Sequence, residues 1–376
     1  MACLRRVSCS SEGFSRRGRG RGFEYVDAAG GRLEDEQTLE RIRALVIPPA
    51  WRDVWICPDP EGHLQAVGTD VAGRRQYLYH PLWRVRRDRQ KFARMLDFAR
   101  ALPSMRRRVE RDLRGQELTR ERVLACAVRL LDRGLFRIGS EEYAETNGSY
   151  GLATIERAHV KLEPGGRLVF DYVAKGGVRR VQAVTDPSAH AVIGQLKARR
   201  GGGRELLAYR NGSWTDIRSS DVNDYVKAVA GGEFTAKDFR TWHATVLAAV
   251  ALAAAPPATS GRAKKRAVTA AVAGVAAQLG NTPAVCRASY IDPRVFDRYM
   301  EGDTIARGLG SLDELEGAAP KLQRRIEAAV LELLTEEAPV TAPARARADA
   351  ARAGRRATPP PARPSRRRAR SSAAPA

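Results

Sequence analysis

Hydrophobic and polar positions divide the chain into a front rich in short strands and a longer helical part. From Phe23 to about residue 82, short apolar runs alternate with Asp-Pro, Glu-Gly and Ala-Gly turns, a pattern typical of strands joined by tight turns. One short helix interrupts them in "DEQTLERIRALVIPPAW" and is expected to stop at Pro48 and Pro49. The pattern predicts a small β-rich domain over residues 23–98.

The rest of the chain mostly spaces its apolar residues as helices do. In "RVLACAVRLLDRGLF" one helical face carries Leu124, Val128, Leu131 and Leu135. Gly134 is suited to end that helix. Two apolar runs flank "AKGG" in "GRLVFDYVAKGGVRRVQAV" and predict a hairpin with Lys175 in its turn. Further helices are expected near 186–199, 220–230, 237–255, 264–279 and 313–335. The fold class is therefore α+β, with a larger, mainly helical domain over residues 99–335.

Both ends of the chain have a composition unlike the rest. Residues 1–22 are basic and Gly-rich ("SRRGRGRG"), which predicts a flexible arm. Residues 336–376 are rich in Pro, Ala and Arg, which predicts a disordered tail. From residue 338 onward this tail holds ten arginines and one aspartate.

The formal net charge narrows the class of partner. It is +22, from 65 Lys and Arg against 43 Asp and Glu. Such an excess favours polyanions, with nucleic acid the leading candidate and an anionic membrane surface the weaker one. The most apolar run, "ATVLAAVALAAA", has only 12 residues and suits a buried helix better than a bilayer span.

Cysteine usage and missing motifs exclude several other classes. The five cysteines are widely spaced and form no CxxC, and the N-terminus lacks an apolar signal region, so reduced thiols and a cytoplasmic location are expected. No P-loop, GxGxxG or clustered metal-ligand spacing occurs. The sequence therefore predicts no metal site and no cofactor.

A tyrosine near the C-terminal end has a setting that suits nucleophilic chemistry. In "LGNTPAVCRASYIDP", Thr282 and Pro283 are good first residues for a short rigid helix that would present Tyr290. Cleaving a phosphodiester without a metal needs a nucleophile, cations around the phosphoryl oxygens and an acid for the departing oxygen. Ordinary helix packing would also explain such a tyrosine.

Three basic residues could supply the cations and the acid. Arginine stays charged and offers forked donors to phosphate oxygens. Arg137 follows the striped helix between two apolar neighbours, Arg240 begins the most apolar helix, and Lys175 occupies the hairpin turn. Each has an ordinary reading as well: a solvated arginine, an arginine with its stem along apolar surface, and an exposed turn residue.

Several long motifs, taken in order, resemble one family. "RIGSEEYAETNGSYGLATI", "KDFRTW" and "LGNTPAVCRASY" are similar to the catalytic motifs of type IB DNA topoisomerases of the compact bacterial and poxviral kind. "IPPAWRDVWICPDPEGHLQAVGTDVAGRRQYLYHPLW" resembles the N-terminal domain of the same family. The resemblance covers roughly residues 23–335. It implies a clamp of two domains around duplex DNA and relaxation of supercoils without ATP or metal.

The resemblance implies a role for each of five residues. Tyr290 matches the nucleophile that forms a 3′-phosphotyrosyl link, and Arg137 and Arg240 match the two arginines that bind the phosphate. Lys175 matches the general acid. The fifth position is Asn281, where poxviral members carry histidine and bacterial ones asparagine. Either side chain can donate a hydrogen bond, but asparagine cannot add a positive charge.

The resemblance also implies DNA contacts outside the catalytic group. "RQYLYH" matches a segment that reads the major groove, and a further tyrosine follows the first catalytic arginine. The implied DNA-contacting residues are Gln76, Tyr77, Tyr79 and Tyr143. We expect a monomer associated with the nucleoid, with double-stranded DNA as its partner, no membrane and no obligate protein partner.

Two other functions remain alternatives at this point. A tyrosine recombinase shares nearly the same catalytic residues, but its second arginine usually lies in an HxxR motif, and here Lys237 stands three residues before Arg240. Recombinases also usually carry a helical front domain. A non-catalytic nucleoid-binding protein would fit the composition and the tail, but it would leave the ordered motifs unexplained.

Overall fold

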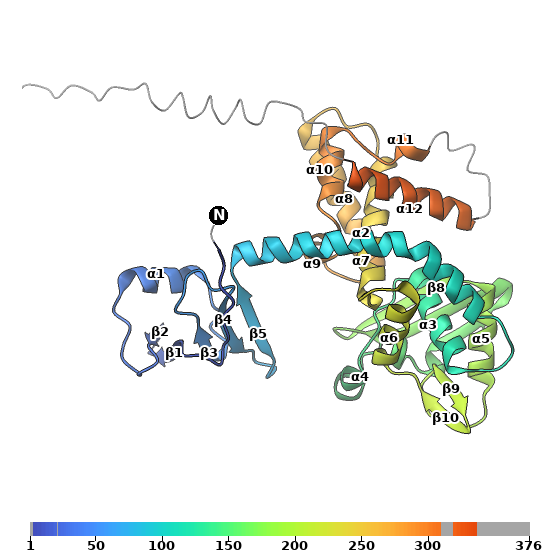
Figure 1. Cartoon of the computed structure of the whole chain (residues 1–376), viewed down its shortest axis with the longest axis horizontal. Coiled ribbons are helices and arrows are strands. Elements are labelled where there is room, and N and C mark those ends of the chain that lie inside the picture. The colour runs from blue at the N-terminus through green and yellow to red at the C-terminus, as the bar shows by residue number, and fades with distance from the viewer. Residues whose placement is uncertain (1–2, 21, 310–318, 337–376) are drawn as a thin grey trace, which may run out of the picture.

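The front of the molecule is an antiparallel five-stranded sheet with its own small core. The computed structural model describes residues 3–20, 22–309 and 319–336. The strands are β1 (Phe14–Arg19), β2 (Gly22–Val26), β3 (Arg52–Ile56), β4 (Leu64–Thr69) and β5 (Arg75–Tyr79), in the order β2-β1-β3-β4-β5. Helix α1 (Glu36–Ala44) buries Ile42 against the sheet residues Val54, Ile56 and Ala66. Figure 1 shows this unit at one side of the molecule.

The sequence predicted a flexible arm at the start of the chain and a disordered tail at its end. The flexible arm predicted over residues 1–22 is wrong for residues 14–19, because they form strand β1 between β2 and β3. The basic side chains of this strand are accommodated by contacts such as that of Arg16, which donates to the carbonyl oxygens of Ile47 and Pro48 at 3.2 and 3.0 Å. The tail predicted from residue 336 lies, apart from that first residue, outside the described residues.

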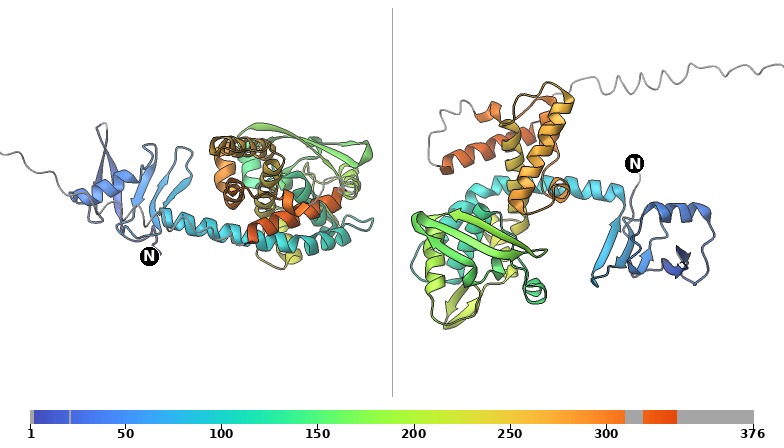
Figure 2. Two further views of the ribbon diagram at one scale, coloured as in Figure 1. Left: turned by 90° about the horizontal axis from the view of Figure 1, so that it is seen from above. Right: turned by 180° about the vertical axis from the view of Figure 1, so that it is seen from behind.

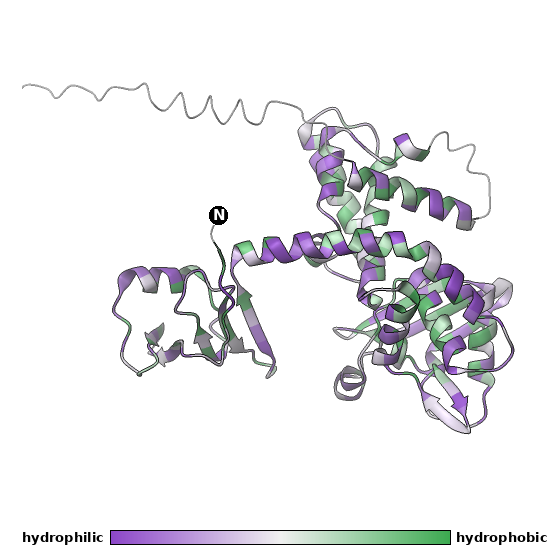
Figure 3. Ribbon diagram, viewed as in Figure 1, coloured by the Kyte–Doolittle hydropathy of each residue, from purple (hydrophilic) through white to green (hydrophobic). Residues whose placement is uncertain are grey.

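A single long helix joins the sheet to the helical part. Helix α2 (Pro81–Asp112) begins directly after β5, with His80 Nδ1 accepting the amide hydrogen of Leu82 at 3.1 Å and Pro81 in the first turn. Its first residues are mostly exposed, and its buried face starts at Phe92. Figure 3 shows the same change from hydrophilic to more hydrophobic residues along the helix. Because α2 carries one unit at each end, it fixes how far apart they lie (Figure 2).

The larger part of the molecule is mainly helical, which with the front sheet confirms the α+β class. Its helices are α3 (Arg120–Gly134), α4 (Glu141–Asn147), α5 (Pro187–Ala198), α6 (Ser219–Ala230), α7 (Ala236–Ala253), α8 (Gly261–Leu279), α9 (Pro283–Ser289), α10 (Arg294–Glu301), α11 (Ala306–Leu309) and α12 (Ala319–Thr335). Helix α3 is at the centre and contacts α2, α5, α6 and α7. The helix predicted to start at residue 313 is described only from residue 319.

Helix α3 ends at the expected glycine, but for a different physical reason from the one expected. The helix does end at Gly134, but the residue in the left-handed conformation is Leu135, with φ of 55°. A Cβ on Gly134 would lie 2.2 Å from the ring of Phe136. Glycine is therefore needed here for close packing rather than for a left-handed turn.

A three-stranded sheet carries the predicted hairpin. Strands β6 (Val160–Glu163), β7 (Arg167–Ala174) and β8 (Val178–Thr185) are antiparallel and adjacent in that order, and Lys175 lies in the β7–β8 turn as predicted. A second hairpin, β9 (Ala208–Asn211) and β10 (Ser213–Asp216), was not expected. Its strands are only four residues long and carry mostly polar side chains, so alternation gave little signal.

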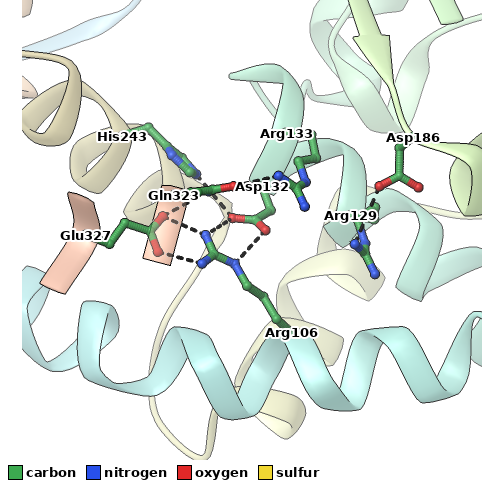
Figure 4. Close-up of polar contacts among 8 residues, drawn as sticks. All are labelled: Arg106, Arg129, Asp132, Arg133, Asp186, His243, Gln323 and Glu327. Atoms are coloured by element: carbon green, nitrogen blue, oxygen red, sulfur yellow. Dashed lines mark hydrogen bonds and ion pairs between the residues drawn. The ribbon is translucent and has the colours of Figure 1, made fainter. Parts of the chain in front are cut away.

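A buried polar cluster fastens the end of α2 to the helical part. Arg106 donates to both oxygens of Asp132 on α3 at 2.8 Å and to both oxygens of Glu327 on α12 at 2.6 and 2.8 Å (Figure 4). His243 on α7 lies 3.4 Å from Asp132. Burial opposes ionisation of Asp132, but the neighbouring His243 and Arg106 outweigh it and hold its pKa below the usual range. Four helices therefore meet at one charge cluster.

None of the helices within the described residues has both the length and the apolar character needed to cross a bilayer.

Candidate active site

The short helix α9 presents Tyr290 as the sequence predicts. Thr282 Oγ1 accepts the amide hydrogen of Val285 at 3.3 Å, and Pro283 occupies the first turn. Tyr290 ends the helix, and its amide donates to the carbonyl of Cys286 at 3.0 Å. Cys286 is fully buried while Tyr290 is half-buried. The phenol is thus carried by a helix that is itself anchored in the core.

Arg240 lies beside that phenol. Its guanidinium carbon is 5.2 Å from the centroid of the Tyr290 ring, and the residue is only 4% exposed. Nη1 donates to the carbonyl of Leu135, and Nη2 donates to the carbonyl of Leu279 at 2.9 Å. Burial lowers the pKa of Arg240 to about 10, with the neighbouring Tyr290 partly offsetting the effect. Arg240 is therefore still a cation at neutral pH, and it is held close to the tyrosine.

Arg137 and Asn281 form a second pair. Nη2 of Arg137 donates to the side-chain oxygen of Asn281 at 2.5 Å and to the carbonyl of Gly280 at 2.6 Å. The side-chain nitrogen of Asn281 has no hydrogen-bond partner among the described residues, although it is buried. The pairing fixes the amide so that its oxygen accepts from Arg137 and its nitrogen remains the unused donor.

Both pairs meet at the C-terminal end of α8. The carbonyl oxygens of Leu279 and Gly280 accept from Arg240 and Arg137, and that of Gln278 accepts from Arg180 at 2.6 Å. The last carbonyls of a helix lack partners within the helix and carry its partial negative charge, so they attract cations. Three arginines from distant parts of the chain therefore converge on three successive residues.

Gly280 makes this convergence possible. Its φ of 62° is the left-handed conformation that favours glycine at a helix end. A Cβ at this position would lie 2.5 Å from Nη1 of Arg180. The turn from α8 into Asn281 depends on the absence of a side chain here.

Lys175 lies on the hairpin turn next to Arg137. Two cavities, of about 350 and 220 Å³, are each lined by both Lys175 and Arg137. The ammonium nitrogen of Lys175 is 5.7 Å from the centroid of the Tyr143 ring. Lys175 is exposed, so the hairpin keeps it at the opening of these cavities rather than in the core.

The predicted DNA-contacting residues do not all share one face. Tyr77 and Tyr79 lie on the same face of edge strand β5, are 43% and 38% exposed, and have ring centroids 6.2 Å apart. Gln76 lies on the opposite face of that strand, where its amide donates to Asp70 at 2.9 Å. Tyr143, on α4, interacts with Arg74 of the β4–β5 turn as well as with Lys175.

One basic residue at this site was missed from the sequence. Arg180 follows directly after Arg179 in "GGVRRVQAV", where nothing distinguishes the two. In strand β8 the side chains of Arg180, Gln182 and Val184 are more buried than their neighbours, so Arg180 faces inward and Arg179 outward. The alternation along the strand places Arg180 on the same face as the buried Val184, and this could have indicated from the sequence that Arg180 points inward.

Comparisons with known proteins show which family the chain is similar to. Residues 81–304 match the family described as "Eukaryotic DNA topoisomerase I, catalytic core", and residues 22–70 match "Bacterial DNA topoisomerase IB, N-terminal domain". The chain is 30% identical over 298 residues to "DNA topoisomerase 1B" of Acanthamoeba polyphaga mimivirus, covering 77% of this chain and 88% of the viral one.

Plant and yeast relatives match over a shorter region. "DNA topoisomerase 1 beta" of Arabidopsis thaliana is 26% identical over 160 residues, which is 42% of this chain and 16% of the plant protein. "DNA topoisomerase 1" of Schizosaccharomyces pombe is 26% identical over 159 residues, which is 42% of this chain and 19% of the yeast protein. All of these proteins are DNA topoisomerases.

This chain belongs to the type IB DNA topoisomerase family. It is accordingly a DNA-binding isomerase. The family decides between the functions that the sequence left open, because the matches over both parts of the chain are to topoisomerases.

Proposed function

We propose that this protein relaxes supercoiled duplex DNA by cutting one strand through a covalent 3′-phosphotyrosyl link, letting the strand rotate, and resealing it. The observation that carries the proposal is the position of Arg240 against the Tyr290 ring, at 5.2 Å from the ring centroid, with Arg137 hydrogen-bonded to Asn281 in the turn after α8. The phosphodiester energy is kept in the covalent link, so resealing requires no ATP.

In the cleavage step the Tyr290 hydroxyl oxygen attacks the phosphorus. A bond forms between that oxygen and phosphorus while the bond from phosphorus to the 5′ oxygen breaks. An ordinary tyrosine is only about 0.1% ionised at neutral pH, so neighbouring cations are needed to favour the phenolate as its proton leaves to solvent. Arg240 is a cation 5.2 Å from the centroid of the ring, and it stays charged at neutral pH.

Arg137, Arg240 and Asn281 stabilise the charge that builds on the non-bridging oxygens. Each guanidinium has five N–H donors, of which the contacts at the end of α8 use only some, so donors remain for phosphate. The unpartnered amide nitrogen of Asn281 supplies a further neutral donor. These donors act in a partly buried site, where each hydrogen bond is worth more than in water.

Lys175 gives its proton to the departing 5′ oxygen. Its exposed place on the β7–β8 turn, beside the cavities it shares with Arg137, supports this role. The reverse step returns the proton to Lys175 as the 5′ hydroxyl attacks the phosphotyrosine. Because Lys175 is on a hairpin turn, its approach to the phosphate depends on the bound DNA strand.

The two parts of the molecule hold the duplex between them. Exposed Tyr77 and Tyr79 on β5 provide groove contacts, and α2 connects this sheet to the catalytic part (Figure 1). Phosphate contacts provide most of the affinity, consistent with the net charge of +22. All five catalytic residues come from one chain, so the protein acts as a monomer on nucleoid DNA without an obligate partner.

The test is relaxation of supercoiled plasmid in EDTA without ATP. The wild-type protein should relax the plasmid, and Tyr290→Phe should not, while both bind a short duplex equally. Tyr25→Phe, a half-buried tyrosine in the front sheet, is the matched control and should retain full activity. Relaxation by Tyr290→Phe, or a strict need for ATP or metal in the wild type, would contradict the proposal.

A further inference from the structure

Arg180 is a third guanidinium at the end of α8. Nη2 donates to the carbonyl of Gln278 at 2.6 Å, and Nε donates to the side-chain oxygen of Gln182. Nη1 lies where a Cβ on Gly280 would come within 2.5 Å. Arg180 therefore touches the helix end two residues before the turn that Arg137 and Asn281 share.

The neighbouring arginine shows that this placement is specific to position 180. Arg179 points outward and donates to both oxygens of Asp171 at 2.8 and 2.6 Å, an exposed pair of small energetic value. Both arginines line the cavity of about 350 Å³ that Arg137 and Lys175 also line, but of the two it is Arg180 that donates to the end of α8. The two adjacent arginines thus have different partners: an exposed carboxylate for Arg179 and the end of α8 for Arg180.

Holding the Arg180 side chain in this position costs free energy. Burial lowers its pKa, partly offset by Tyr172, and no carboxylate pairs with it among the described residues. Arg137 lies close enough to lower the pKa of Arg180 further. A half-buried cation with another cation nearby is compensated only by neutral oxygens and the negative end of a helix, which fold stability alone does not require.

We propose that Arg180 is a positioning residue for the cleavage reaction. By holding the carbonyl of Gln278 and packing over Gly280, it fixes the turn that places Asn281 and, through Asn281, the guanidinium of Arg137. It acts on the turn rather than on the DNA. This inference rests on the proposed cleavage mechanism, in which Asn281 and Arg137 contact the phosphate.

The experiment uses single-turnover cleavage of a duplex oligonucleotide in which the released piece, which carries the free 5′ hydroxyl, is too short to stay bound. Arg180→Met removes the charge and the hydrogen-bond donors while filling similar space. Arg180→Lys keeps the charge but lacks the forked donors of a guanidinium. Arg179→Met is the matched control. Arg180→Met should cleave about 10- to 100-fold more slowly, as expected when a reacting group is displaced slightly. Arg180→Lys should be intermediate, and Arg179→Met should stay within about twofold of the wild type.

Two further readouts separate positioning from a structural or DNA-contact role. The dissociation constant for the duplex should keep its dependence on salt in both Arg180 variants, whereas loss of a phosphate contact would lower the slope of log K against log salt by about 0.9. Arg180→Met added to Asn281→Ala should slow cleavage little beyond Asn281→Ala alone, because both changes act through the same group.

The outcomes are distinct from failure of the proposed function. A wild-type cleavage rate in either Arg180 variant, fully multiplied effects in the double variant, or a reduced salt slope would overturn the positioning role. Because Arg180→Lys is tested as well, the conclusion does not depend on whether the methionine variant folds. If the wild-type protein formed no covalent adduct, the proposed mechanism itself would fail, whatever the variants did.

Discussion

At the scale of the residue, Asn281 is the group whose chemistry is most open to measurement. Its oxygen is occupied by Arg137, and its nitrogen is free among the described residues. We expect Asn281→Ala to slow single-turnover cleavage by about 100-fold, the usual cost of losing one donor to a developing anion. Asn211→Ala, at the exposed end of β9, should cleave at the wild-type rate.

The same pair of variants tests how Asn281 acts. If the amide serves only in the transition state, the dissociation constant for an uncleavable duplex should be unchanged by Asn281→Ala. A variant that cleaved normally but bound tenfold more weakly would show that Asn281 contributes to binding instead.

Much of the candidate site could be predicted from sequence, but the end of α8, where its arginines meet, could not. Tyr290 and Thr282 show a local pattern that the structure confirms, since the short helix depends on neighbouring residues alone. The convergence of Arg137 and Arg240 on the end of α8 depends on contacts between residues 143 and 39 positions apart in the chain. Arg180 was missed because the packing of the sheet decides which face of the strand its side chain occupies. The adjacent residues in the sequence do not.

At the scale of the element, the charge cluster around Arg106 holds α2 against the helical part. Without Asp132, Arg106 keeps Glu327 but loses two charge-assisted hydrogen bonds in a buried site, so we expect Asp132→Ala to lower the free energy of unfolding by about 3 kcal/mol. Urea denaturation at pH 7 measures this loss. Asp97→Ala removes the partner of Arg100 in an exposed pair on the same helix and should change the free energy by about 0.5 kcal/mol or less.

The same cluster predicts how this stability varies with pH. The pKa of Asp132 is lower in the folded protein than its unfolded value of about 3.9. Its contribution is therefore complete above that value and is lost as the pH falls through the folded pKa. The difference between wild type and Asp132→Ala should shrink below about pH 4. A difference that grew with acidity would contradict this assignment.

Elements with strong apolar periodicity were predicted well, and weakly patterned ones were not. The helix over 120–134 and the hairpin with Lys175 follow from spacing alone. Strand β1 was missed because "FSRRGR" is basic and Gly-containing, and its strand state comes from pairing with β2 and β3. Tertiary pairing overrides local preference in such segments.

At the scale of the whole molecule, the basic tail adds charge without adding a catalytic group. Residues 338–376 hold ten arginines and one aspartate, so we expect their removal to weaken duplex binding at moderate salt and to flatten its salt dependence. Cleavage at low salt should be unchanged, as measured by covalent adduct formation at saturating enzyme. Loss of cleavage at low salt after truncation would place part of the chemistry in the tail.

The division into a β-rich front and a helical catalytic part follows from composition and periodicity, whereas the connection between them does not. The sequence pattern placed the change from strands to helices near Pro81. In the structure a single helix of 32 residues, α2, begins there. Its length is fixed by packing against α3, α6, α7 and α12, which no local pattern reports. The separation of the two units is thus a property of the assembled core.

The central claim is that the hydroxyl of Tyr290 becomes bonded to the 3′ phosphate of a cut strand. The most direct measurement is to trap wild-type protein on supercoiled DNA with denaturant, digest both components, and identify the modified peptide by mass spectrometry. We predict a single phosphodeoxynucleotide on Tyr290, with free 5′ hydroxyl ends on the cut DNA. Attachment to another residue, or a link through the 5′ phosphate, would contradict the account.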